Sequence, residues 1–251
     1  MKKSIFLLLP LLVAAWGCQS FEDTLTPSDM TVSQLEEKMS KAMDPESRYS
    51  SSTNCIIKQL VKIPQFLDED QESMVVTKLK KPGKFHISTI KDNEPVNVVC
   101  SDGINGWVAD YDSKSITVLD GTQLTRMLTL AKIGNQPGGY SKIFKKVEIF
   151  RCTMDDRQYY VLHCTGNTDT VFDIFVDAKT FFVSMVKAKV KIGIANTLDY
   201  ESKVLSYRRY DGVVIPQESI DIQNGQTRKV SIIDYDLDSE IADSDFQAPV
   251  F

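Results

Sequence analysis

The sequence has few of the residues from which catalytic and metal sites are usually built. It contains two histidines, His86 and His163, and no C-x-x-C pair, so the usual spacing of zinc ligands is missing. It also lacks the nucleophile motif G-x-S-x-G, the metal-binding motif H-E-x-x-H and both glycine-rich phosphate-binding motifs. We therefore expect a protein that is not an enzyme and that carries no metal and no cofactor.

Positive charge is also in short supply. The chain has 29 Lys and Arg against 34 Asp and Glu, and its formal net charge is −5. Binding to nucleic acid depends on a basic surface that neutralises phosphates, so no nucleic acid partner is expected. Hydrophobic residues make up 42% and charged residues 25%, values typical of a folded globular protein.

The apolar run at the N-terminus, Ile5–Ala15, is too short to span the roughly 30 Å of a bilayer. Lys2 and Lys3 precede it, and this combination predicts a secretory signal peptide. It ends in Gly17-Cys18, which fits a bacterial lipobox, whereas Trp16 fits that motif poorly. We expect a lipid on Cys18; the alternative is ordinary signal cleavage near Gly17.

These features divide the chain into three parts. Residues 1–18 are the expected signal peptide, 19–29 a polar tether, and 30–251 a single domain. The lipid on Cys18 would anchor the protein to a membrane, and Gln19 after it favours the outer membrane over retention at the inner one. The sequence thus predicts an exported monomer on the periplasmic face of the outer membrane.

Four further cysteines follow Cys18, and an oxidising compartment permits disulfides between them. Cys152 and Cys164 lie on the two arms of an expected hairpin, so one interpretation pairs them and leaves Cys55 to pair with Cys100. The alternative is four buried free thiols. Both remain open at this stage.

Alternating apolar and charged residues predict strands over most of the domain. Between Val171 and Asp221 this alternation is clearest, as in Phe172-Asp173-Ile174. A period of two with charge on one face is typical of a half-buried antiparallel strand, and short turns between such segments indicate a meander. The charged face includes Lys187, Lys189 and Lys191, which we expect to face water; contact with anionic lipid headgroups is the alternative.

Helical spacing occurs in two places. Val32, Leu35, Met39 and Met43 predict an amphipathic helix that Ser28 or Asp29 caps and Pro45 ends. Midway along the chain a second helix is expected over 124–133, with a short further one over 140–147. The predicted fold is mainly β with accessory α: a curled, incomplete antiparallel barrel of about eleven strands, with an N-terminal helix and a mid-chain helical lid.

A helix against a curled sheet encloses either a filled core or an apolar cavity. The apolar residues expected to face this space come from both helices and from the strands: Leu35, Met39, Trp107, Leu124, Met127, Leu128, Phe172, Ile174, Val186 and Val190. They form the candidate ligand-binding site, for a lipid or for the acyl chains of a lipoprotein. The alternative is that these side chains fill the space themselves.

Several short sequence segments resemble those of the LolA/LolB-like outer-membrane lipoprotein-sorting superfamily, and the resemblance covers roughly residues 30–250. They are Lys81–Phe85, Ser101–Gly103 with Gly106-Trp107, Val176–Thr180, Tyr210–Pro216, and Ile241 with Asp245-Phe246. The resemblance implies an open, strongly curved half-barrel with an apolar interior. It also implies a carrier or acceptor of lipoprotein acyl chains. Together with the lipobox at Cys18, it makes the chain a lipidated member of that superfamily by expectation. The alternative function is a non-catalytic structural or signalling envelope lipoprotein with a packed core and a protein partner.

Overall fold

The computed structural model describes residues 25–65, 70–133, 137–167, 170–192 and 196–251. Strands dominate this part of the chain. They are β1 (Thr26–Pro27), β2 (Asn54–Ile63), β3 (Gln71–Lys80), β4 (Lys84–Lys91), β5 (Glu94–Ser101), β6 (Gly106–Asp110), β7 (Ser115–Val118), β8 (Lys146–Met154), β9 (Arg157–Thr165), β10 (Val171–Asp177), β11 (Val183–Ile192), β12 (Asn196–Tyr210), β13 (Val213–Gln223) and β14 (Gln226–Asp236).

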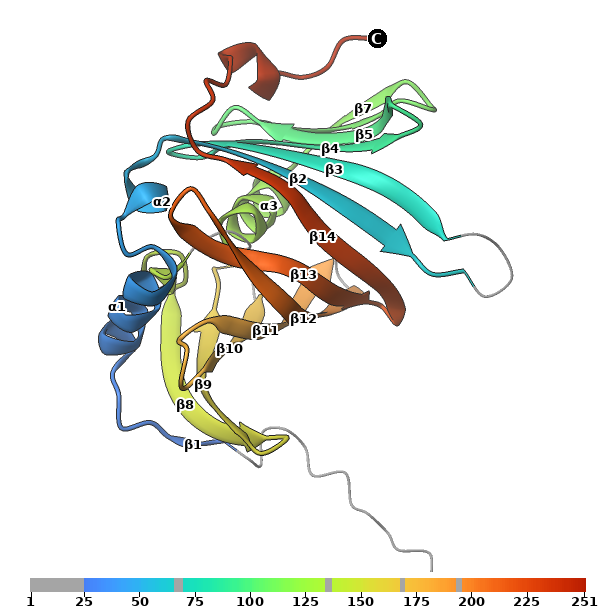
Figure 1. Cartoon of the computed structure of the whole chain (residues 1–251). Helices are drawn as coiled ribbons and strands as arrows, with labels where there is room; N and C mark the ends of the chain where they lie inside the picture. Colours follow the sequence, from blue (N-terminus) through green and yellow to red (C-terminus); the bar gives the residue numbers. More distant parts are fainter. Residues whose placement is uncertain (1–24, 66–69, 134–136, 168–169, 193–195) are drawn as a thin grey trace, which may run out of the picture.

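All of these strands belong to one antiparallel sheet whose order is β1-β8-β9-β10-β11-β12-β13-β14-β2-β3-β4-β5-β6-β7. Two meanders, β2–β7 and β8–β14, are joined where β14 pairs with β2. The sheet curls around a hollow without closing, because its end strands β1 and β7 do not pair with each other (Figure 1). The prediction of a curled, incomplete antiparallel barrel is confirmed.

The described chain has fourteen strands where about eleven were expected. One of the additional strands lies in the expected tether: Thr26 pairs with Arg151, and Pro27 pairs with Phe150. The end of that segment is therefore an edge strand of the sheet, whereas the sequence predicted a spacer. The expected signal peptide, Cys18 and the tether up to residue 24 lie outside the described residues.

The register of β10 and β11 follows the alternation in the sequence. Ile174 lies opposite Val186, and Asp173 lies opposite Lys187. Because residues directly opposite each other share a face, the apolar pair marks the inner face and the charged pair the outer one. Lys187 also approaches Glu201 of the neighbouring strand at 3.5 Å. Charge is thus kept on the convex side of this part of the sheet.

The N-terminal helix α1 (Val32–Met43) begins one turn later than expected. Its cap is Thr31, whose hydroxyl oxygen accepts a hydrogen bond from the Gln34 N–H at 3.3 Å, while the Thr31 N–H donates to Gln34 Oε1 at 2.9 Å. This reciprocal capping box satisfies two backbone N–H groups at the start of the helix. Leu35, Met39 and Met43 form its buried face, as the spacing predicted.

The mid-chain helix α3 (Gly121–Ile133) lies within the curve of the sheet (Figure 1). The carboxylate of Asp120 caps it by accepting a hydrogen bond from the Gln123 N–H at 2.8 Å. Between α3 and β8, which begins at Lys146, the described residues 137–145 contain one 3₁₀ turn, η2 (Tyr140–Lys142). The expected second short helix over 140–147 is therefore a single turn. A further short helix, α2 (Arg48–Ser51), follows α1.

Both faces of the sheet carry buried clusters. The main core joins α1 to the inner face of β9–β11, and Leu35, Met39, Leu162 and Ile174 are each 0% exposed there. On the opposite face of β4 and β5 the C-terminal segment packs through a 3₁₀ turn, η3 (Asp243–Phe246), with Phe246 fully buried. Among the described residues, no helix has the length and apolar character needed to cross a membrane.

Candidate functional site

The hollow of the sheet contains an apolar cavity of about 410 Å³. This volume falls within the roughly 300–1,000 Å³ typical of small-molecule sites. Side chains from β10–β14, from α3 and from the end of α1 form its walls. They include Met43, Leu130, Ile133, Phe172, Val183, Val186, Ala188, Val190, Val204, Val213, Ile215 and Ile232. Among the described residues its lining contains Glu218 and Asp221 but no lysine or arginine.

A hydrogen-bonded polar cluster around Asp221 interrupts this apolar wall. The Asp221 carboxylate accepts hydrogen bonds from Ser202 Oγ at 2.7 Å, from Ser219 Oγ at 2.9 Å and from Tyr200 OH at 3.1 Å. Burial, and then the nearby Asp221 charge, raise the pKa of the Tyr200 phenol, so it stays a neutral donor. The cavity therefore has a satisfied polar patch in a mainly apolar wall, to which Gln59, Gln217, Glu218 and Gln223 also contribute polar side chains.

A second pocket, of about 490 Å³, lies on the other side of α3. We call it the lysine pocket, because Lys80, Lys81, Lys84 and Lys142 line it together with apolar residues such as Leu79, Phe85 and Leu128. Pro137 lines both spaces. Within α3, Leu128 lines the lysine pocket, whereas Leu130 and Ile133 line the apolar cavity. Helix α3 and Pro137 therefore separate two adjoining spaces.

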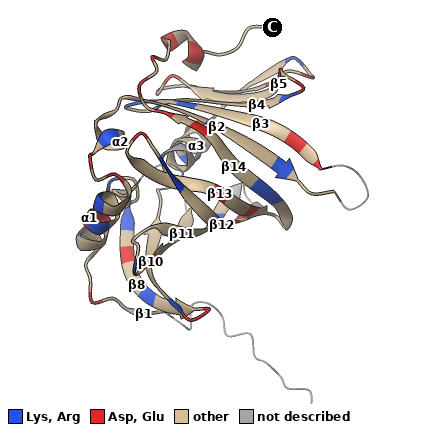
Figure 2. Ribbon diagram, in the orientation of Figure 1, with Lys and Arg blue, Asp and Glu red and all other residues tan. Residues whose placement is uncertain are grey.

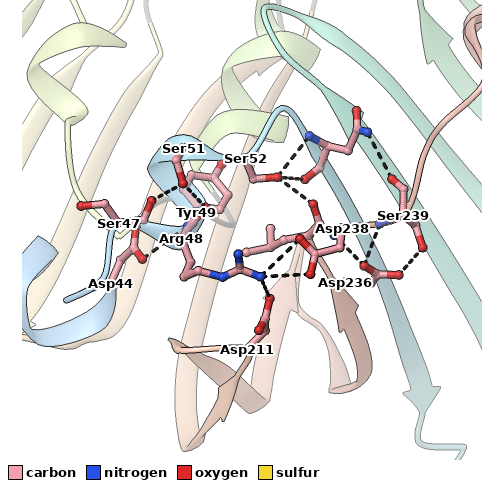
Figure 3. Close-up of polar contacts among 12 residues, drawn as sticks. Asp44, Ser47, Arg48, Tyr49, Ser51, Ser52, Asp211, Asp236, Asp238 and Ser239 are labelled. Carbon is pink, nitrogen blue, oxygen red and sulfur yellow. Dashed lines mark hydrogen bonds and ion pairs between the residues drawn. The ribbon is translucent and has the colours of Figure 1, made fainter.

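Helix α2 forms one wall of the lysine pocket, and polar contacts tie it to the sheet (Figure 3). Arg48 forms ion pairs with Asp211, in the turn between β12 and β13, and with Asp238, after β14; its Nη2 lies 3.0 Å from Asp238 Oδ2. The buried Asp44 carboxylate accepts hydrogen bonds from the backbone N–H groups of Tyr49 and Ser50 at 3.3 and 3.2 Å. This segment is thereby held against the strand ends.

Three of the ten predicted cavity residues, Phe172, Val186 and Val190, line the apolar cavity. Three others, Leu35, Met39 and Ile174, belong to the packed core that adjoins it. Leu128 lines the lysine pocket, while Met127 is half-buried on α3 and lines neither space. The structure thus contains both of the expected arrangements, a filled core and a cavity, next to each other. Ligand contact by these residues stays a prediction.

Trp107 does not face the hollow, contrary to the sequence prediction. It lies opposite Cys100 in the β5–β6 ladder, and Cys100 Sγ donates to the Gln247 carbonyl of the C-terminal segment at 3.4 Å. Trp107 therefore lies on the outer face. The inward position belongs to Gly106, on which the predicted residue Leu124 packs closely.

The four described cysteines are buried free thiols, so the suggested disulfides are not formed. In the β8–β9 ladder Cys152 lies opposite Tyr159, whereas Cys164 lies opposite Val147. The two cysteines also belong to clusters on opposite faces of the sheet. Cys55 and Cys100 are on β2 and β5, with two strands between them. Neither proposed pair has the close approach that a disulfide requires.

Both histidines lie away from these two spaces. His86 Nδ1 is 2.6 Å from the carbonyl oxygen of Asp245, and His163 Nδ1 is 2.7 Å from Asp173 Oδ1. Neither residue lines the apolar cavity or the lysine pocket. Among the described residues, no group of three or more His, Cys, Asp or Glu side chains is placed to hold a metal ion.

Two parts of the site were not identified from the sequence. The Asp221 cluster comes from β12 and β13, where the period-two pattern is interrupted by polar residues on the inner face. Such an interruption can be recognised in the sequence and could have identified this cluster. The lysine pocket combines the β3–β4 turn with η2 and α2, and this combination depends on tertiary structure.

The fold and the hollow together define a class of structure: an open, curved antiparallel half-barrel whose hollow holds a helix, known as the LolA-like fold. The chain is similar to a LolA superfamily protein from Nitrosomonas europaea, with a TM-score of 0.59, 14% identity, and coverage of 87% of this chain and 98% of that one. This similarity confirms the fold that the sequence resemblance implied.

Two further structures have the same architecture. A DUF1329 family protein from Desulfovibrio piger matches with a TM-score of 0.56 and 11% identity, over 86% of this chain and 97% of that one. A Vibrio parahaemolyticus domain described as an outer membrane lipoprotein-sorting protein matches with a TM-score of 0.52 and 11% identity, over 84% and 97%. No family model matches the sequence. No curated protein matches it either.

Proposed function

We propose that this protein is an envelope lipoprotein that binds a lipid, or the acyl chains of lipoproteins, in its apolar cavity. It would act as a carrier or acceptor in outer-membrane lipoprotein sorting. The observation that carries this proposal is the cavity of about 410 Å³ between α3 and the inner face of β10–β14. Burying the methylenes of a C16 chain there, at ~0.8 kcal/mol each, is worth on the order of 10 kcal/mol before entropy costs.

Three further features support the proposal. The similar structures include a LolA superfamily protein and a domain described as lipoprotein-sorting. The N-terminal sequence predicts a signal peptide and a lipobox at Cys18, which would place the domain at the periplasmic face of the outer membrane. A buried apolar site also needs no reacting group, which fits a binding protein that is not an enzyme.

The test is direct lipid binding. Ala188 lines the cavity and is 5% exposed, so Ala188→Phe fills part of the space. We expect the unaltered protein to co-purify with lipid by mass spectrometry and to take up a fluorescent fatty acid, and Ala188→Phe to lose most of that uptake. Ile233→Phe, at a residue that is 50% exposed, is the matched control. A protein that purifies without lipid and takes up no fatty acid rules the proposal out.

Membrane anchoring has its own test. Cys18→Ser removes the acceptor of the lipid, so the protein should move from the membrane fraction to the soluble periplasmic fraction. Gln19→Asp provides a second variant: it keeps the cysteine but should shift the protein from the outer to the inner membrane. Unchanged fractionation of Cys18→Ser contradicts the anchor and leaves the cavity proposal standing.

One observation favours the alternative of a packed structural or signalling lipoprotein. The core beneath α1 is solid, with Leu35, Met39 and Ile174 each fully buried. If the protein works through a partner, cross-linking in cells should capture one stable protein while lipid stays absent from the purified sample.

A further inference from the structure

The lysine pocket differs in charge from the rest of the molecule. Lys80, Lys81, Lys84 and Lys142 belong to its lining, and among the described residues no acidic one does. The ammonium groups of Lys80 and Lys84 reach Asp243 in the C-terminal segment, so the charge at the pocket rests on Lys81 and Lys142. The whole chain, in contrast, has a net charge of −5. In the view of Figure 2, positive and negative residues are mixed over the strands and over α1. A pocket lined by charge of one sign is therefore a local feature that attracts anions.

The nearby carboxylates only partly balance these lysines. Lys80 and Lys84 share one carboxylate, that of Asp243, at 2.8 and 3.1 Å. Lys81 Nζ donates to the backbone carbonyls of Tyr49 and Ser50 at 2.6 and 3.3 Å and lies 4.6 Å from the centre of the Tyr49 ring. These partners are uncharged.

A second acid, Asp44, acts on Lys81. Its carboxylate is 4% exposed and already accepts hydrogen bonds from the backbone N–H groups of Tyr49 and Ser50. Lys80 and Lys84 are paired with Asp243, and Asp44 balances Lys81, so Lys142 leaves an excess of one positive charge at the pocket. An anionic group entering the pocket would balance this excess through charge-assisted hydrogen bonds.

The apolar cavity adjoins this pocket, and the described charged residues of its lining are acidic, not basic. Pro137 lines both spaces, and the C-terminal half of α3 lies between them. The cavity lining includes Glu218 and Asp221, and in the part of the chain that the structure describes it has no lysine or arginine. A ligand with one anionic end and one apolar end therefore fits the two spaces in one orientation, with the anion next to the lysines.

We propose that the lysine pocket binds the anionic headgroup, carboxylate or phosphate, of an acyl-chain ligand whose chain passes Pro137 into the apolar cavity. This inference rests on the proposed lipid binding and adds the class of lipid and the direction in which it lies. It gives Lys81 and Lys142 a role in selecting anionic lipids. Because the ammonium groups lie near the surface, the selectivity should weaken as salt is raised.

The experiment compares ligands that share one chain. The full-length protein is titrated with palmitate, with its uncharged methyl ester, with the corresponding lysophosphatidic acid and with zwitterionic lysophosphatidylcholine. Displacement of a fluorescent fatty acid gives each affinity. We expect the anionic ligands to bind at least tenfold more tightly than the methyl ester. The stronger of palmitate and the lysophosphatidic acid identifies the headgroup as carboxylate or phosphate.

The variants separate charge from chain binding. Lys81→Met with Lys142→Met should weaken anionic ligands roughly tenfold, as expected for two partly exposed charge pairs, and leave the methyl ester unchanged. Lys41→Met with Lys114→Met removes the same charge elsewhere and should change neither. Equal binding of charged and uncharged ligands overturns the headgroup site while the cavity proposal stands. Failure of every ligand to bind overturns both.

Discussion

Leu124, in the first turn of α3, packs directly on Gly106 of β6. A β-carbon at residue 106 would lie 2.8 Å from Leu124 Cδ1 and 3.0 Å from Leu119 Cδ1, closer than packed side chains approach. The absence of a side chain at residue 106 therefore lets α3 lie close to the sheet. This contact fixes one end of the helix that separates the two spaces.

Gly106→Ala should lower the free energy of unfolding by about 1–3 kcal/mol, because the new methyl group displaces Leu124 or Leu119. Leu124→Ala alone should cost about 2–5 kcal/mol. In the double variant the two losses should be smaller than their sum, which urea unfolding measures as a double-mutant cycle. Gly121→Ala is the control, since nothing lies within 4 Å of its β-carbon position. Strictly additive losses would contradict direct contact.

The ion pairs of Arg48 should control the mobility of α2. Arg48→Ala removes the contacts to Asp211 and Asp238, so amide hydrogen exchange in residues 48–52 should become faster while exchange in β9–β11 is unchanged. Lys41→Ala removes an exposed pair with Glu37 and serves as the control. If exchange rises equally across the sheet, the contacts stabilise the whole fold and do not act on α2 alone.

Core and surface positions should respond differently to loss of side-chain volume. Met39 is 0% exposed beneath α1, so Met39→Ala should cost about 2–5 kcal/mol in urea unfolding. Ile104 is 82% exposed, and Ile104→Ala should stay within about 0.5 kcal/mol of the unaltered protein. A small effect of Met39→Ala would show that the core relaxes into the adjoining cavity.

The buried thiols should make stability depend on pH in the alkaline range. Burial raises the pKa of Cys55 to about 12 and that of Cys100 to about 11, from an ordinary value of 9.0. Their contribution to stability is therefore fully present below pH 9 and is lost as the pH rises from there through the folded-state pKa values. In this range the thiols ionise in the unfolded protein but stay protonated in the folded one. The slope per thiol approaches about 1.4 kcal/mol per pH unit.

Urea unfolding between pH 7 and pH 11 measures this slope, and Cys55→Ala should reduce it. The same thiols should resist iodoacetamide at pH 8 until the protein unfolds, since the thiolate is the reacting form. In a Cys18→Ser protein unfolded without reductant, all four remaining cysteines should be alkylated. Fewer than four would reveal a disulfide.

The structure predicted from the sequence was most accurate where the prediction rested on a local pattern of residues. The placement of Phe172 and Ile174 on either side of Asp173 identified the inner face of β10 correctly, because strand periodicity alone decides it. Trp107 was placed on the wrong face, because in a short strand the face depends on which residue begins the pairing, and a glycine took the inward position. The capping residue of α1 was shifted to Thr31 by its reciprocal bonds with Gln34.

The site was only partly accessible from sequence. Phe172, Val186 and Val190 were identified by their period, whereas the lysine pocket gathers Lys80 and Lys84 with Lys142 from separate parts of the chain. No spacing rule brings such residues together. Their neighbourhood follows from the curvature of the sheet and the position of α3, which are properties of the assembled fold.

The pairing of β14 with β2 also has a consequence for how the molecule is made. Lys58 of β2 and Asp234 of β14 meet across this seam at 2.8 Å, although 176 positions separate them. Synthesis starts from the N-terminus, so β2 emerges early and presents an unpaired edge until the final hairpin appears. Such unpaired edges can pair with strands of other chains, and contacts between residues far apart in the sequence form slowly. Arrival of the last strand is therefore the step that ends exposure of this edge to aggregation.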